Sequence, residues 1–113
     1  MDRGTRTTER RKHPRYHVEY VLSLLGERSQ GQGVARDLSV RGCRARSPVG
    51  VTAGVSVGLL IDVPCYDNPL HVDMAIIRWT KEQEFGMEFI SMGPDNQQRL
   101  QEVIRTSETH RTA

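Results

Sequence analysis

The feature that most constrains the fold of this chain is an alternation of apolar and polar residues that recurs along most of its length. It is clearest near the start, where the apolar positions are Tyr16, Val18, Tyr20, Leu22 and Leu24. Successive side chains of a β-strand point to opposite faces of a sheet, so a period of two predicts a strand with one buried face. Residues 16–24 are therefore expected to form such a strand.

Further segments of strand character follow, separated by turn signals such as those at residues 26–31 and 66–69. They are a strand beginning with Val34, Arg36 and Leu38, one around Cys43 and Ala45, one from Val55 to Val63, one over residues 70–80, and one with Phe85, Met87 and Phe89 facing inward. Six short strands at regular spacing are typical of a small barrel or sandwich. Because closure removes exposed strand edges, we expect an all-β fold, a six-stranded antiparallel β-barrel.

The end of the chain has a different pattern. Residues 93–95 read Gly-Pro-Asp, which is a helix-start signal because proline suits the first turn and aspartate suits the positive end of the helix dipole. Leu100, Val103 and Ile104 then fall on one helical face. We therefore expect one C-terminal α-helix of about three turns, packed on the strands or capping an open end.

The length of 113 residues fits one domain. Residues 10–106 are expected to form it, and the polar residues 1–9 and 107–113 are expected to be flexible tails. The N-terminus lacks the apolar segment of a signal peptide, and the apolar runs are shorter than a membrane span needs. A cytoplasmic location is therefore expected.

Composition and motifs argue against several kinds of site. A net charge of +2 is too small to indicate nucleic-acid binding. Cys43 and Cys65 have no CxxC spacing, so buried free thiols are expected, although a single disulfide stays open. Pro14 and the strand pattern argue against a helical metal pair of His13 and His17. Because no P-loop, GxGxxG or GxSxG motif occurs, the chain is not expected to be an enzyme or to need a cofactor or metal.

The first fifteen residues form a basic arm. Its basic residues are Arg3, Arg6, Arg10, Arg11, Lys12 and Arg15. Such an arm attracts anions, and arginine can pair bidentately with phosphate or with the O6/N7 edge of guanine. A solvated tail that aids solubility accounts for the charge equally well.

A second candidate segment is residues 37–42, which read Asp-Leu-Ser-Val-Arg-Gly between two expected strands. The carboxylate of Asp37 can accept the N1–H and N2–H of guanine, and Ser39 can donate or accept a hydrogen bond. Gly42 is expected to allow positive φ and close approach of a ligand. The same residue types are common in hairpin turns, so the segment alone fits either interpretation.

Taken together, the two segments resemble the signature of the PilZ domain family, bacterial receptors for cyclic di-GMP. The signature is RxxxR followed by (D/N)xSxxG, and here it reads Arg11 to Arg15 and then Asp37 to Gly42. The strand endings at residues 77–79 and 85–89 extend the resemblance, which covers roughly residues 9–106.

The resemblance implies a six-stranded antiparallel barrel with a C-terminal helix, as well as a site for cyclic di-GMP. Arg11 and Arg15 would bind the phosphates and guanine edges of the ligand. Asp37 and Ser39 would hydrogen-bond guanine, and Gly42 would keep the floor of the site open.

Two more residues enter through the resemblance. In this family an arginine at the position of Arg10 is associated with two mutually intercalated ligand molecules, so an intercalated dimer of cyclic di-GMP is expected. Trp79, the only tryptophan, is expected to share a strand face with Ala75 and Ile77. It would lie beside a bound guanine, with ordinary packing as the alternative. Independently of the resemblance, Arg44 and Arg46 would point outward from the strand after the second motif, either adding positive field near the site or simply being solvated.

The function implied is that of a receptor whose N-terminal arm changes conformation on binding and signals to an unidentified downstream protein. A small nucleic-acid-binding β-barrel is one alternative, although few aromatic side chains are available for stacking. The other is a nucleotide-independent protein adaptor of the same fold.

Overall fold

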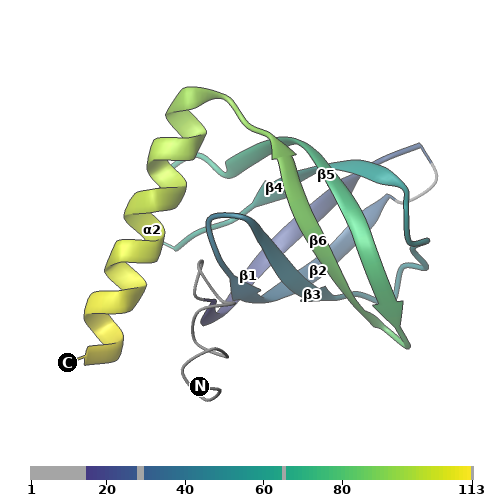
Figure 1. Cartoon of the computed structure of the whole chain (residues 1–113), viewed down its shortest axis with the longest axis horizontal. Coiled ribbons are helices and arrows are strands. Elements are labelled where there is room, and N and C mark those ends of the chain that lie inside the picture. The colour runs from purple at the N-terminus through teal and green to yellow at the C-terminus, as the bar shows by residue number, and fades with distance from the viewer. Residues whose placement is uncertain (1–14, 28–29, 65, 113) are drawn as a thin grey trace, which may run out of the picture.

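The structure is a computed structural model that describes residues 15–27, 30–64 and 66–112. Its elements are β1 (Tyr16–Leu25), β2 (Gly31–Leu38), β3 (Gly42–Arg46), β4 (Ser56–Ile61), β5 (Leu70–Lys81), β6 (Glu84–Ser91) and α2 (Pro94–Thr112) (Figure 1). The expected order of six strands followed by a C-terminal helix is confirmed. The basic arm lies outside the described residues, apart from Arg15.

The six strands form a closed barrel in the order β1-β2-β3-β6-β5-β4. All neighbouring strands are antiparallel, and the pairing of β1 with β4, with Leu24 opposite Leu59, closes the barrel. Closure gives every strand of the barrel a paired neighbour on both sides, as the sequence pattern indicated.

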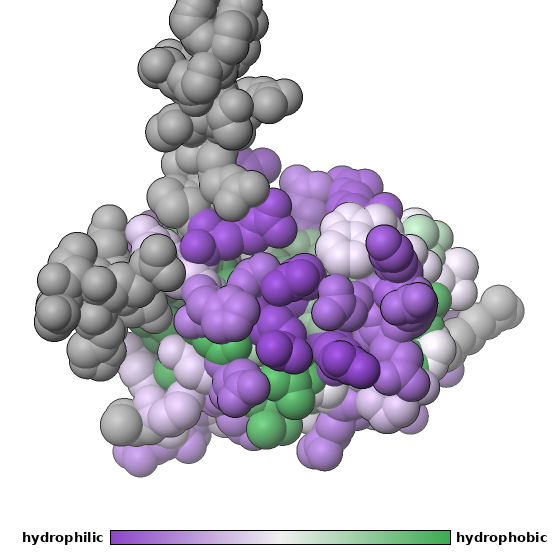
Figure 2. All heavy atoms as spheres, turned by 90° about the horizontal axis from the view of Figure 1, so that it is seen from below, coloured by the Kyte–Doolittle hydropathy of each residue, from purple (hydrophilic) through white to green (hydrophobic). Residues whose placement is uncertain are grey.

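The barrel interior is filled by the residues that the alternation assigned to the inward face. Leu22, Leu24, Leu59 and Phe85 are among the largest fully buried side chains. Burial of each stabilises the fold by roughly 1.5–3 kcal/mol. Cys43 is a buried free thiol, as expected. The outward positions are largely polar, and on the face seen in Figure 2 apolar side chains form only small separate areas.

The helix α2 lies beside one end of the barrel (Figure 1). It begins at Pro94, as its start signal predicted, and buries Leu100 and Val103 against the core. Near its start, Arg99 Nη1 donates to the carbonyl of Pro69 over 3.2 Å. With 19 residues, or about five turns, the helix is longer than the three turns expected. No helix in the described part of the chain is long and apolar enough to cross a membrane.

A bulge in β2 changes the predicted phase of that strand. Ala35 lies opposite Ala45 and Asp37 lies opposite Arg44, so two steps on β2 match one step on β3 and Arg36 is the extra residue. The insertion changes the inward phase within the strand, so that Ala35 before it and Leu38 after it are both buried.

A second bulge, in β5, has the larger effect on the candidate site. Ile77 lies opposite Met87 and Trp79 lies opposite Gly86, so Arg78 is the extra residue. Ala75 and Ile77 are fully buried, but Trp79 is 40% exposed. The expectation that Trp79 shares their face is wrong, because the bulge turns its side chain to the outside of the barrel.

Candidate functional site

The turn between β2 and β3 is built around the side chain of Ser39. Its backbone N–H donates to the carbonyl of Gly42 over 2.9 Å, and its hydroxyl donates to the same carbonyl over 3.3 Å. The hydroxyl oxygen also accepts the backbone N–H groups of Arg41 and Gly42, over 3.1 and 3.2 Å. Through these hydrogen bonds the buried hydroxyl of Ser39 holds the turn together.

Gly42 is required by close packing of two strands. It lies opposite Glu88 on β6, and a Cβ at this position would overlap the carbonyl oxygen of Met87 and lie 3.2 Å from the Cα of Glu88. Its φ is not among the positive values, which belong to Gly31 and Gly54 among the described glycines. The expectation of positive φ is therefore wrong. The close approach is real, but it is made by the neighbouring strand.

Asp37 stands just before this turn on the outer face of the barrel, with its side chain 19% exposed. Its Oδ1 is 3.2 Å from Nδ1 of His17 on β1. Its Oδ2 is 2.9 Å from Nε of Arg44 on β3, an ion pair whose geometry does not make a hydrogen bond. The carboxylate is thus held between one neighbour on each adjoining strand.

These contacts belong to a row of paired residues that runs across five strands. His17 lies opposite Asp37, Asp37 opposite Arg44, Arg44 opposite Gly86, and Gly86 opposite Trp79. We call these five residues the outer row. It brings Asp37 and Trp79, which are distant in the sequence, onto one face of the barrel.

Gly86 gives the indole of Trp79 its place on that face. A Cβ on Gly86 would overlap Nε1 of Trp79 and lie 2.6 Å from its Cε2. The indole therefore lies directly over the glycine, which explains why Gly86 is buried on the outer side of the barrel. Trp79 is nevertheless 40% exposed, and an exposed indole of this kind can stack against a base.

An ion-pair cluster borders the outer row. Arg78, the bulge residue, donates from Nε to Oε1 of Glu88 over 2.8 Å. Arg41, in the β2–β3 turn, places Nη2 3.6 Å from Oε2 of the same carboxylate. The hydrogen bond and charge of Arg78, followed by those of Arg41, lower the pKa of Glu88 from its usual value. The two arginines are therefore anchored beside the turn.

Arg15 is exposed and directly precedes β1. The first residue of β1, Tyr16, pairs with Leu38, so the chain enters the barrel beside the turn that holds Ser39 and Gly42. Arg10 and Arg11 lie outside the described residues. The structure thus brings together Asp37, Ser39, Gly42 and the Arg15 end of the first motif, with Trp79 further along the same face.

Sequence reasoning missed two members of this arrangement and one of its contacts. As a candidate site residue His17 was considered only as half of a metal pair, Gly86 was given no role, and the pairing of Arg44 with Asp37 was not foreseen. The alternation of β3 did predict that Arg44 points outward, as it does. The signal that could have found the pairing is strand register, but the bulges at Arg36 and Arg78 make register impossible to count from sequence alone.

The described part of the chain contains no group of three or more histidine, cysteine or acidic residues that could hold a metal ion. Burial, reinforced by the charge of Asp37, raises the pKa of Cys43 to about 12. A thiol with so high a pKa is not a nucleophile near neutral pH.

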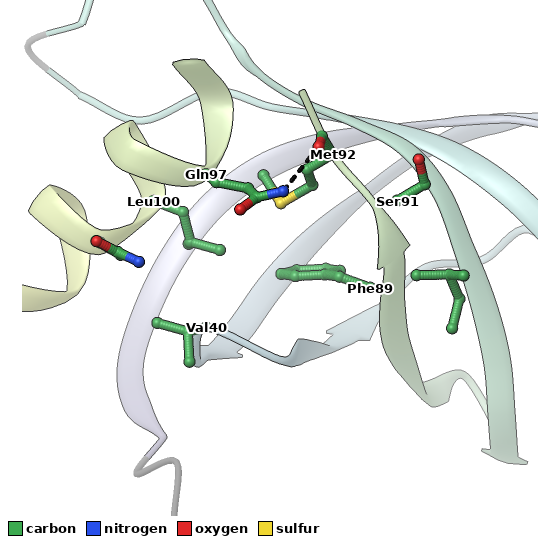
Figure 3. A pocket seen from close by; sticks show the side chains of 8 residues that line it. Val40, Phe89, Ser91, Met92, Gln97 and Leu100 are labelled. Carbon is green, nitrogen blue, oxygen red and sulfur yellow. Dashed lines mark hydrogen bonds between the residues drawn. The ribbon is translucent and has the colours of Figure 1, made fainter. Parts of the chain in front are cut away.

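A small pocket of 180 Å³ lies between β6, α2 and the β2–β3 turn. Its walls include Val40, Phe89, Met92 and Leu100 (Figure 3). Gln97 crosses its rim, where Nε2 donates to the carbonyl of Met92 over 2.9 Å. The pocket therefore lies between the helix and the turn that contains Ser39.

Comparison with known proteins gives one family and several similar structures. The profile of the PilZ domain family matches residues 9–106. YcgR from Escherichia coli, in complex with c-di-GMP, superposes with a TM-score of 0.76 at 19% identity over 91% of this chain and 48% of that one. The PilZ domain of YcgR with c-di-GMP superposes with a TM-score of 0.69 at 18% identity over 89% of this chain and 93% of that one.

The inhibitor of motility MotI/DgrA of Bacillus subtilis has a TM-score of 0.69 at 17% identity, over 88% of this chain and 52% of that one. The chain therefore spans about half the length of YcgR and of MotI/DgrA. No curated protein matches the sequence. At these identities the structural likenesses establish the fold.

Proposed function

The chain belongs to the PilZ domain family, and from that premise we propose that it is a receptor for cyclic di-GMP. The observation that carries the proposal is the outer row. It presents a carboxylate that can accept the N1–H and N2–H of guanine on the same barrel face as an exposed indole. Two structurally similar chains, both of YcgR, were determined with c-di-GMP, which supports the choice of ligand.

We assign the proposed contacts by residue type and position. Arg11 and Arg15 bind phosphate oxygens and guanine edges through their guanidinium forks. Asp37 accepts from one guanine, and Trp79 contacts a base, which contributes about 1–3 kcal/mol. Ser39 and Gly42 contribute through the turn that follows Asp37, which the hydroxyl of Ser39 holds by hydrogen bonds to Gly42.

We further propose that the ligand binds as an intercalated dimer, with Arg10 supplying a cation for the second molecule. Isothermal titration calorimetry at saturation is then expected to give two molecules of cyclic di-GMP per chain. A ratio of one would contradict the dimer but not the receptor.

The proposed response to the ligand is ordering of the basic arm around it, which alters the surface offered to a downstream protein. Hydrogen exchange of residues 3–15 is expected to slow when cyclic di-GMP is added. Unchanged protection of these amides would contradict this mechanism. The proposal includes a cytoplasmic location for the receptor and an unidentified downstream protein as its partner.

Direct titration with cyclic di-GMP is the test of the function. Arg15→Ala and Asp37→Ala are each expected to weaken binding by about 1–3 kcal/mol, the value of a bidentate contact to guanine. The matched control is Arg46→Ala, which removes an exposed arginine two residues along β3 from the outer row. Its affinity for cyclic di-GMP is expected to be much closer to that of the wild type.

The outcome also separates the alternatives. A nucleotide-independent adaptor would show no binding to the wild-type chain. A nucleic-acid-binding barrel would prefer polynucleotide, with an affinity that falls steeply with salt concentration. If both variants bind cyclic di-GMP as the wild type does, the site assignment is wrong.

A further inference from the structure

We infer that Arg44 is a further ligand-binding residue, and that Glu84 competes with the ligand for it. This inference rests on the proposed function, because it concerns the same site and the same ligand. It adds a contact outside both sequence motifs and a residue whose removal should tighten binding.

The position of Arg44 in the outer row carries the first step. It lies directly between Asp37 and Gly86, the glycine beneath the indole of Trp79. A guanine that reaches from the carboxylate toward the indole would therefore lie close to Arg44. The side chain is 31% exposed, so part of it is open to solvent, although its Nε is buried.

The ion pairs of Arg44 carry the second step. Its Nε is 2.9 Å from Oδ2 of Asp37, and its Nη1 is 3.5 Å from Oε1 of Glu84. Nε is buried and makes no hydrogen bond with the described residues. The guanidinium is thus positioned by two carboxylates, but the hydrogen-bonding capacity of its Nε–H is not used.

The chemistry of guanine identifies what this guanidinium can bind. A guanine whose N1–H and N2–H are accepted by Asp37 presents its O6 next to N1, on the side of the same edge away from N2. A cation beside the carboxylate is suited to donate to that oxygen, and arginine is the residue that most often reads the O6/N7 edge. Asp37 and Arg44 together would then recognise one base, the first as acceptor and the second as donor.

Glu84 opposes this contact. Its side chain is 38% exposed, and an exposed ion pair of this kind is weak. It is nevertheless a negative charge on the guanidinium that O6 needs, and the ligand is itself an anion. Loss of the Glu84 charge should therefore leave Arg44 free to turn toward the base and remove a local repulsion.

The test is a double-mutant cycle on the full chain, with cyclic di-GMP titrated by calorimetry at one salt concentration. Glu84→Gln is expected to bind about two to five times more tightly than wild type, the range of a surface ion pair. Arg44→Gln is expected to bind at least about five times more weakly. In the Arg44→Gln background, Glu84→Gln is expected to change affinity little, because the residue it acts on is gone.

A matched control separates the specific pair from the general field of the protein. Glu82 is an exposed carboxylate two residues away in the same hairpin, and Glu82→Gln removes the same charge. If Glu82→Gln tightens binding as much as Glu84→Gln, or if the Glu84→Gln gain persists without Arg44, the inference is overturned. Each variant is also checked by thermal unfolding, and an unfolding temperature close to that of the wild type shows that the variant keeps the fold.

The cycle also distinguishes this inference from the proposed function. If the wild-type chain takes up no cyclic di-GMP, the proposed function fails first. If the wild type binds and Asp37→Ala weakens binding, while Arg44→Gln and Glu84→Gln bind as the wild type does, the function stands and only the role of Arg44 is lost.

Discussion

Replacement of the motif glycine Gly42 by alanine is expected to destabilise the barrel through a backbone collision. The added Cβ would overlap the carbonyl oxygen of Met87 and lie 3.2 Å from the Cα of Glu88. Both atoms belong to the main chain of a paired strand and cannot rotate away, so β3 and β6 must move apart. Overpacking of this kind typically destabilises by about 1–3 kcal/mol. For a domain of this size, that lowers the unfolding temperature by roughly 4–8 °C for each kcal/mol.

Thermal unfolding followed by circular dichroism measures the effect. The matched control is Gly50→Ala, because a Cβ at Gly50 meets nothing within 4 Å and its φ is not positive. This control is expected to keep or slightly raise the unfolding temperature. If Gly42 served only to keep the ligand site open, Gly42→Ala would unfold with the control and lose only affinity for cyclic di-GMP. That result would refute the reasoning.

Three further outcomes are expected. In a Cys65→Ser background, Cys43 should resist iodoacetamide at pH 8 until the protein is unfolded, because burial raises the pKa of its thiol to about 12. Leu100→Ala should destabilise the protein to urea by about 2–5 kcal/mol, since this side chain is only 2% exposed between α2 and the barrel. Glu88→Gln should unfold at a lower temperature than wild type at pH 7, and the gap should close as the pH falls through the folded pKa of Glu88. The reason is that Arg78 lowers this pKa below 4.5 in the folded state, so the contribution is present above pH 4.5 and lost in acid.

Each of these outcomes has a control. Gln101→Ala changes an exposed neighbour of Leu100 on the helix and should leave the urea midpoint almost unchanged. Glu82→Gln removes an exposed carboxylate elsewhere in the same hairpin and should leave the unfolding temperature at pH 7 almost unchanged. Rapid alkylation of Cys43 in the folded protein would mean that β3 opens locally or that the thiol is reachable, and either result contradicts its burial.

The sequence was sufficient for most of the fold because the information there is local. Alternation of period two identified the inward residues of β3 and β6, and the Gly-Pro-Asp signal placed the start of α2 at Pro94. Barrel closure followed from the need to satisfy strand edges. The length of α2 was not predicted, because residues 107–112 are polar and carry no apolar periodicity that would reveal a helix.

The faces of Arg36 and Trp79 could not be predicted in the same way. A bulge inserts one residue into one strand, so every later residue of that strand changes face. The consecutive charged residues Arg36 and Asp37 do not fit either phase of an unbroken strand, but they do not show which residue is the extra one. In residues 75–79 the alternation fits an unbroken strand and marks no extra residue. Only the partner strand, through its register, identifies Arg36 and Arg78 as the insertions.

The two bulges act together on the candidate site. Without the insertion at Arg78, Trp79 would continue the inward phase of Ala75 and Ile77 and compete for core volume. Without the insertion at Arg36, Asp37 would continue the inward phase of Ala35, where an unpaired carboxylate is strongly unfavourable. Each bulge therefore moves one polar or aromatic side chain from the interior to the outer row. The residues of the proposed site can face a ligand because β2 and β5 depart from regular alternation at Arg36 and Arg78, which are two of several register shifts in the barrel.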